Sequence, residues 1–157
     1  MLSTCRLLLR PLTILIGTIA VFGQFPALAD EPVHAQVLLR SSTSWDGSAY
    51  TAYPTSAPEL TVLKITIPAH ASLPWHTHPI PNAGYVVSGE LMVERRSDGK
   101  SITVRQGDVL PELVGQPHRG VAGNSDVVLI VFYAGSKGLP LSEILPDETT
   151  RAGLPDK

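Results

Sequence analysis

The sequence contains almost no cysteine, since Cys5 is the single one among 157 residues. One cysteine cannot form a disulfide within the chain, so a small domain held together by disulfides is excluded. Cys5 also lies in a segment that we expect to be removed. The remaining chain would then carry no thiol, which excludes a cysteine nucleophile and thiolate metal ligands.

Runs of basic residues are missing as well. The chain has 12 Lys and Arg against 14 Asp and Glu, which gives a net charge of −2. A mildly acidic domain without a basic patch is a poor candidate for nucleic-acid binding. We therefore expect a small-molecule ligand and no nucleic-acid partner.

Long hydrophobic runs are confined to the N-terminus. Arg6 and Arg10 precede the apolar run PLTILIGTIAVFG, and Ala-Leu-Ala follows at 27–29. This order is typical of a secretory signal peptide over residues 1–29, cleaved before Asp30. The run is shorter than the ~20 residues of a spanning helix, which disfavours the alternative of a retained anchor. We expect a periplasmic or secreted protein with no membrane partner after cleavage.

Helical periodicity over several turns is missing from the rest of the chain. Instead, alternating and β-branched segments recur at short spacing between Gly, Pro, Asn and Asp residues, as in LTVLKITIP, GYVVSGELMVERR, SITVRQGDVL and DVVLIVFYAG. Such a pattern predicts an all-β fold, a sandwich or a barrel. We expect an N-terminal arm over 30–58, a barrel over 59–136 and a tail over 137–157. A short strand candidate, AQVLLR, lies in the arm.

Two histidines stand out in this β pattern. Side chains two residues apart on a strand point to the same side, so His76 and His78 present two imidazoles together. If that side is the barrel interior, burying them unpaired costs free energy that a metal ion would offset. His118 is the candidate third ligand, and three neutral imidazoles with open positions are typical of a catalytic-type metal site.

The spacing around these histidines resembles the cupin superfamily, and the format resembles its small secreted bacterial single-domain members. The first cupin motif is Gly, five residues, His-x-His, three or four residues, Glu, six residues and Gly. Here His76 and His78 are followed at that spacing by Asn82 and Gly89. The resemblance covers about residues 60–135 and implies a double-stranded β-helix, a small jelly-roll-like barrel.

The second cupin motif is also present. It starts with Gly, here Gly107, and continues through Pro-x-Gly, here Leu113-x-Gly115, to its histidine, here His118. The resemblance implies that this histidine completes the metal site. It does not distinguish Fe, Zn, Mn and Ni, and it implies a homodimer formed through strand packing.

Two departures from the motifs bear on structure and chemistry. His70 stands where the first motif opens with Gly, at a turn that favours a left-handed backbone. Asn82 stands at the position of the carboxylate ligand and is an additional candidate ligand, with a neutral and weaker oxygen. A three-His site would carry about +2 instead of about +1, so we expect it to hold anionic ligands better.

Further candidates for the ligand pocket are Tyr85 and Glu112. Glu112 lies between Gly107 and His118, where it either faces the pocket as a base or forms a solvated loop carboxylate. Two functions remain open at this point. One is a small exported cupin whose metal site binds a small molecule. The other is a metal-dependent enzyme of oxygenase, hydrolytic or isomerase type, and fold alone does not decide between them.

Overall fold

The computed structural model describes residues 32–146. The predicted signal peptide over 1–29 and the end of the tail lie outside the described residues. Contacts divide the chain at Ala35, and Gln36 begins the unit that holds all the strands. Within 32–146 there is no helix with the length and hydropathy needed to cross a membrane.

The described residues form an antiparallel β structure, which confirms the predicted fold class. The strands are β1 (Pro58–Ile67), β2 (His76–Thr77), β3 (Asn82–Ser88), β4 (Glu90–Arg95), β5 (Ser101–Arg105), β6 (Val109–Pro111), β7 (His118–Ala122), β8 (Val127–Ser136) and β9 (Glu143–Ile144).

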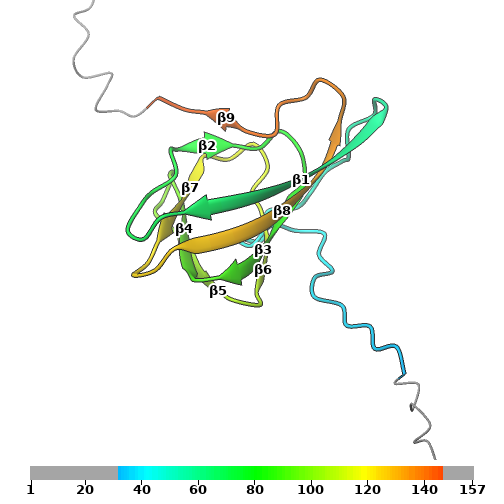
Figure 1. Cartoon of the computed structure of the whole chain (residues 1–157). Helices are drawn as coiled ribbons and strands as arrows, with labels where there is room; N and C mark the ends of the chain where they lie inside the picture. The colour runs from blue at the N-terminus through cyan, green and yellow to red at the C-terminus, as the bar shows by residue number, and fades with distance from the viewer. Residues whose placement is uncertain (1–31, 147–157) are drawn as a thin grey trace, which may run out of the picture. The chain divides into compact units, whose positions relative to one another are not determined.

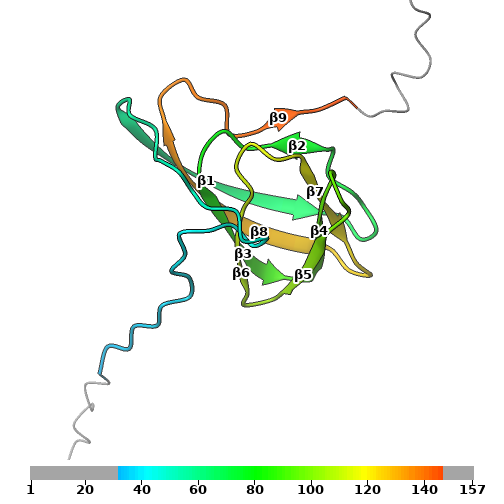
Figure 2. The ribbon, with the colours of Figure 1, turned by 180° about the vertical axis from the view of Figure 1, so that it is seen from behind.

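The strands are arranged in two sheets that face each other (Figures 1 and 2). One sheet has the order β1-β8-β3-β6 and the other has the order β5-β4-β7-β2-β9. The connection from β3 to β4 turns at Gly89, whose φ is +85°. A β-carbon there would lie 2.4 Å from the carbonyl oxygen of Asp126, so only glycine fits this turn between the sheets.

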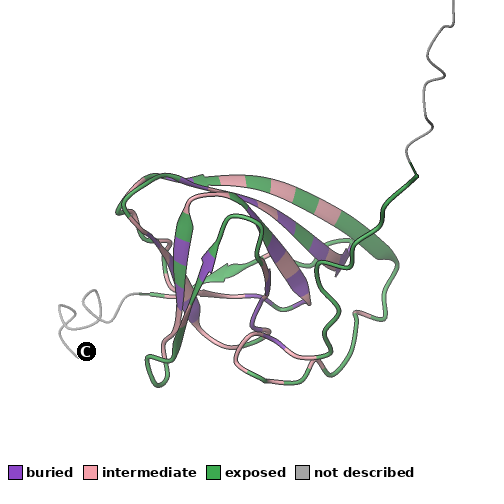
Figure 3. Cartoon of the chain, turned by 90° about the horizontal axis from the view of Figure 1, so that it is seen from below, coloured by how far each residue is buried: buried purple, intermediate pink, exposed green. Residues whose placement is uncertain are grey.

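Alternation along the strands creates the core between the sheets. Figure 3 shows long strands banded by burial, and in β8 every second residue from Val127 to Gly135 is buried. This period of two places one face of each strand inside. The buried cluster is formed by Ile67, Ile80, Val86, Leu91, Val93, Val104, Leu110, Ala122, Val127, Leu129, Val131 and Tyr133.

The N-terminal arm docks on the barrel without forming the strand predicted at 35–40. Residues 35–40 are exposed and irregular, because no neighbouring strand is available for their backbone hydrogen bonds. Further along, Trp45 packs against the core, and its backbone N–H donates to the Pro111 carbonyl at 2.9 Å. The Tyr50 hydroxyl donates to the Glu112 carbonyl at 2.7 Å. The arm therefore fastens the segment that follows β6.

Candidate metal centre

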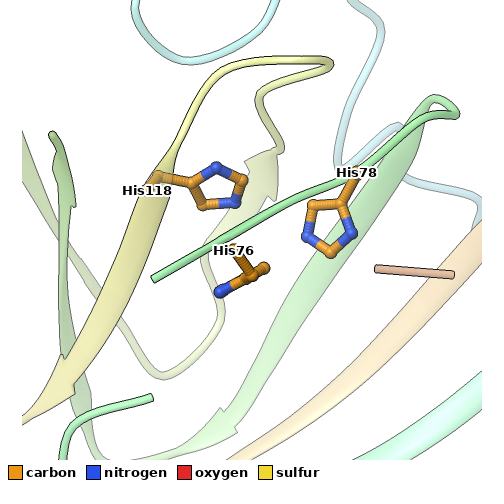
Figure 4. Close-up of side chains that lie close together, drawn as sticks. All are labelled: His76, His78 and His118. Carbon is orange, nitrogen blue, oxygen red and sulfur yellow. The ribbon is translucent and has the colours of Figure 1, made fainter. Parts of the chain in front are cut away.

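Three histidines converge inside the barrel, as the sequence predicts. His76 and His118 are paired residues of the neighbouring strands β2 and β7, and His78 follows two positions after His76. Their ring centroids are separated by 4.6 Å for His76 and His118, 4.9 Å for His76 and His78, and 5.1 Å for His78 and His118. Figure 4 shows the three rings directed toward one another.

The ring nitrogens that could bind an ion all lie within 4.8 Å of one another. Zinc–nitrogen bonds of ~2.0–2.1 Å would require closer nitrogens, so each would have to shift by less than about 1 Å. His78 and His118 are buried and His76 is half-buried. His76 is therefore the most accessible of the three rings.

Backbone carbonyls fix the protonation of the imidazoles. The Nδ1 atoms of His76, His78 and His118 lie 2.8, 2.7 and 2.8 Å from the carbonyl oxygens of Pro74, Leu141 and Gln116. A carbonyl can only accept, so each Nδ1 carries the hydrogen and each Nε2 is left with a lone pair when the ring is neutral. Hydrogen bonds of this kind, from the ring nitrogen that faces away from the ion, hold metal-binding histidines in place.

Burial lowers the pKa of His76 and of His78, which keeps both rings neutral. A neutral imidazole is the form that binds a metal ion. The residues present therefore fit a divalent cation, with three Nε2 donors already oriented toward a common centre.

Glu112 is the fourth ionisable group at this centre. It lines the same cavity as the three histidines, and its Oε2 lies 3.3 Å from His118 Nε2. Burial alone would raise the pKa of Glu112, but the nearby His118, His78 and His76 hold it below its usual range. Conversely, Glu112 raises the pKa of His118 against the effect of burial. The alternative of a solvated loop carboxylate was wrong, since only 9% of Glu112 is exposed.

A pattern in the sequence could have placed Glu112 inside. Leu110 lies in β6 and is buried, and residues two apart on an extended chain share a face. Glu112 therefore continues the inward face of β6. The carbonyls of Pro74, Gln116 and Leu141 were missed because backbone groups leave no signal in side-chain spacing.

Asn82 and Tyr85 do not line the histidine cavity. Asn82 is buried, and its side-chain amide donates to the Ile80 carbonyl at 3.3 Å. It lines a separate pocket beside Tyr50 and Tyr53 of the arm. Tyr85 is 36% exposed, whereas its neighbours in β3 are buried, so the alternation of the strand directs it outward. This position contradicts its expected role in the pocket.

The cavity beside the histidines is small and opens at one end. Its inner part has a volume of about 40 Å³, room for about one water molecule. The mouth adds about 200 Å³ and is bounded by His76 and His78 together with Leu63, Ile65, Leu73, Pro74, Tyr133, Leu141, Ser142 and Ile144. Its walls are therefore largely apolar, with the two imidazoles at their inner end.

Several known structures are similar to this one over part of its length, at low sequence identity. DMSP lyase DddQ from Ruegeria pomeroyi is 17% identical, with a TM-score of 0.49, over 62% of this chain and 46% of that one. A cupin-like protein from Thermotoga maritima is 20% identical, with a TM-score of 0.47, over 62% and 75%. A Klebsiella pneumoniae protein described as having a double-stranded β-helix domain is 16% identical, with a TM-score of 0.48, over 62% and 92%.

This chain thus spans less than half the length of the lyase, and no curated protein matches it in sequence. The family comparison is more direct, because residues 63–133 match the cupin domain. That segment runs from β1 to β8 and includes all three histidines. Residues 63–133 of the protein therefore form a cupin domain.

Proposed function

We propose that this protein binds a divalent metal ion through His76, His78 and His118 and captures a small organic molecule at the mouth of the same cavity. The observation that carries this proposal is the set of three Nδ1–carbonyl contacts, which leave three Nε2 lone pairs facing one centre. A bound ion would act as a Lewis acid toward a ligand oxygen or water.

The test is a calorimetric titration of purified, metal-free protein with Zn²⁺ and with Mn²⁺. Wild type should bind one ion per chain, and His76→Ala should abolish tight binding because it removes a principal ligand. His34→Ala is the matched control, since His34 is exposed and lies far from the three histidines in the sequence. Wild-type protein that binds neither ion would refute the metal site.

A metal-dependent enzyme is the second candidate function. The mouth of the cavity is bounded by His76 and His78 themselves, so a small molecule seated there would reach the ion directly. Its volume of about 200 Å³ is below the usual range of drug-sized pockets and favours a small substrate. Turnover of any member of a small-molecule panel by metal-loaded protein, lost in His76→Ala, would support catalysis over capture.

We also propose export to the periplasm or the exterior, which rests on the N-terminal sequence pattern. Mass spectrometry of the protein isolated from its native compartment should give a chain that begins at Asp30. An intact N-terminus at Met1 would contradict cleavage and the export proposal with it.

A homodimer is our proposal for the outer face of the β1-β8-β3-β6 sheet. Val62 of β1 pairs with Phe132 of β8, and their side chains are 59% and 42% exposed. Leu60 is 69% exposed and Tyr85 of β3 adds to the same face. A flat apolar sheet face is well suited to packing on a second copy of itself. Analytical ultracentrifugation should show a dimer for wild type and a monomer for Phe132→Glu.

A further inference from the structure

One oxygen of the Glu112 carboxylate, Oε2, is buried at the centre without a hydrogen-bond partner. Neither this atom nor the Nε2 of His118 forms a hydrogen bond, although both atoms are buried and lie 3.3 Å apart. His118 already uses its Nδ1 hydrogen on the Gln116 carbonyl, so two lone pairs face each other when the ring is neutral. A buried pair of this kind needs a positive charge between its members, either a proton on His118 Nε2 or a metal ion.

The distance between these two atoms matches that of neighbouring ligands on one metal ion. Zinc bonds to imidazole nitrogen and carboxylate oxygen are ~2.0–2.2 Å long, which places adjacent ligand atoms about 3.0–3.5 Å apart. The separation of 3.3 Å falls within this range. Glu112 Oε2 can therefore occupy a coordination position next to His118 with little movement.

The pairing of β3 with β6 relates Glu112 to the carboxylate that the first motif lacks. The Glu112 backbone N–H donates to the Asn82 carbonyl at 3.1 Å, directly after the paired residues Ala83 and Pro111. The two residues thus stand opposite each other on strands that are about 4.8 Å apart. The Glu112 carboxylate thus enters the cavity from the end of β6, the strand next to β3, which begins with Asn82.

The arm holds this alternative carboxylate in place. The Tyr50 hydroxyl donates to the backbone carbonyl of Glu112 at 2.7 Å, and the backbone N–H of Trp45 donates to the carbonyl of the preceding Pro111 at 2.9 Å. Both contacts come from a segment more than 60 residues earlier in the chain. They fix the backbone from which the Glu112 side chain enters the cavity.

We propose that Glu112 is the carboxylate ligand of this metal centre. It replaces the carboxylate of the first cupin motif, whose position is occupied here by the neutral Asn82. This inference rests on the proposed metal function. It also corrects the charge expected from the sequence, because three neutral imidazoles and one carboxylate give a divalent site a charge of about +1. The preference for anionic ligands expected of a +2 site is thereby removed.

The test compares Zn²⁺ and Mn²⁺ titrations of wild type, Glu112→Gln and the control Glu59→Gln, which alters an exposed carboxylate of β1. Glu112→Gln keeps the shape but removes the charge, so its affinity should fall at least about tenfold. Glu59→Gln should bind like wild type. Equal affinity of Glu112→Gln and wild type would overturn the assignment while leaving the three-His site intact.

A failure of the metal site itself would look different, because wild type and all variants would then show no binding. That result would overturn the assignment of Glu112 together with the proposed function. Should Glu112→Gln not fold, a crystal structure of wild type grown with Zn²⁺ decides the matter. It should place Glu112 Oε2 about 2.0–2.2 Å from the ion, and a carboxylate that stays outside bonding distance would refute the proposal.

Discussion

At the scale of single residues, His70 carries a backbone conformation that its side chain disfavours. It has a φ of +63°, the single positive value among the described non-glycine residues. Its backbone N–H donates to the Gly123 carbonyl at 3.0 Å, so the turn is held by the second sheet. The sequence comparison with the cupin motif anticipated this strain, because the motif has Gly at that position.

We predict that His70→Gly stabilises the fold. Glycine reaches the left-handed region without a steric cost of about 1–2 kcal/mol. Glycine is more flexible in the unfolded chain, which lowers the free energy of unfolding by roughly 0.5–1 kcal/mol. The net increase in the free energy of unfolding is on the order of 0.5 kcal/mol. Urea unfolding should show a higher midpoint for His70→Gly and a lower one for His70→Val, whose β-branched side chain suits the turn even less. A lower midpoint for His70→Gly would mean that the His70 side chain itself stabilises the turn.

The shared direction of His76 and His78 was predictable from spacing because a strand gives residues two apart a common face. The sequence also offers Glu112 as a pocket residue, but the motif places the carboxylate at position 82, so spacing alone does not single out Glu112. The link between the two positions is a backbone hydrogen bond between β3 and β6. Which strands pair, and in which register, depends on the whole fold, so the local sequence does not show that positions 82 and 112 are neighbours.

At the scale of elements, β9 lies beside the candidate metal centre although it has only two residues, Glu143 and Ile144. It pairs with β2 opposite His76 and Thr77, and the preceding Leu141 provides the carbonyl that accepts from His78. The sequence predicts only a tail over 137–157, without a role at the site. Its first part instead lines the mouth of the cavity through Leu141 and Ile144.

We predict that a chain ending at Gly138 keeps the barrel but binds metal about 10–100-fold more weakly. The barrel strands β1 to β8 remain, whereas His78 loses the partner that fixes its tautomer and orientation. A chain ending at Pro146 is the matched control and should bind like the full-length protein. Isothermal titration with Zn²⁺ measures the difference, and circular dichroism verifies the fold. Equal affinity of the two chains would show that the Leu141 carbonyl is dispensable.

At the scale of the whole molecule, one carboxylate fastens the arm to the barrel. Asp46 accepts hydrogen bonds from the Ser44 hydroxyl at 2.6 Å and from the Ser48 N–H at 2.8 Å, and it forms an ion pair with Arg95 of β4. Its side chain is fully buried. Although burial alone would raise the pKa of Asp46, its hydrogen bonds and Arg95 lower it to about 2.

We predict that this attachment is lost in acid. The pKa of Asp46 is lower in the folded state than its ordinary value of 3.8, so ionised Asp46 stabilises the fold above about pH 4. That contribution disappears as the pH falls from about 4 to 2. At pH 7, Asp46→Asn should reduce the free energy of unfolding by on the order of 2 kcal/mol, since it breaks charge-assisted hydrogen bonds.

Asp98→Asn is the control, because Asp98 pairs with the same Arg95 but is half-exposed. Exposed ion pairs contribute at most about 1 kcal/mol, so this variant should unfold close to wild type. Urea unfolding measured at pH 7 and pH 3 gives both comparisons. The difference between wild type and Asp46→Asn should shrink at pH 3, and a difference that does not change would show that Asp46 is not the acid-sensitive group.

The contact between His78 and Leu141 also sets an order of events during synthesis. The two residues are separated by 63 positions, so all three histidines leave the ribosome well before the carbonyl that orients His78. A nascent chain that has completed β1 to β8 still lacks the carbonyl that orients its second histidine. The ring of His78 would therefore reach its final orientation only after translation has passed Leu141.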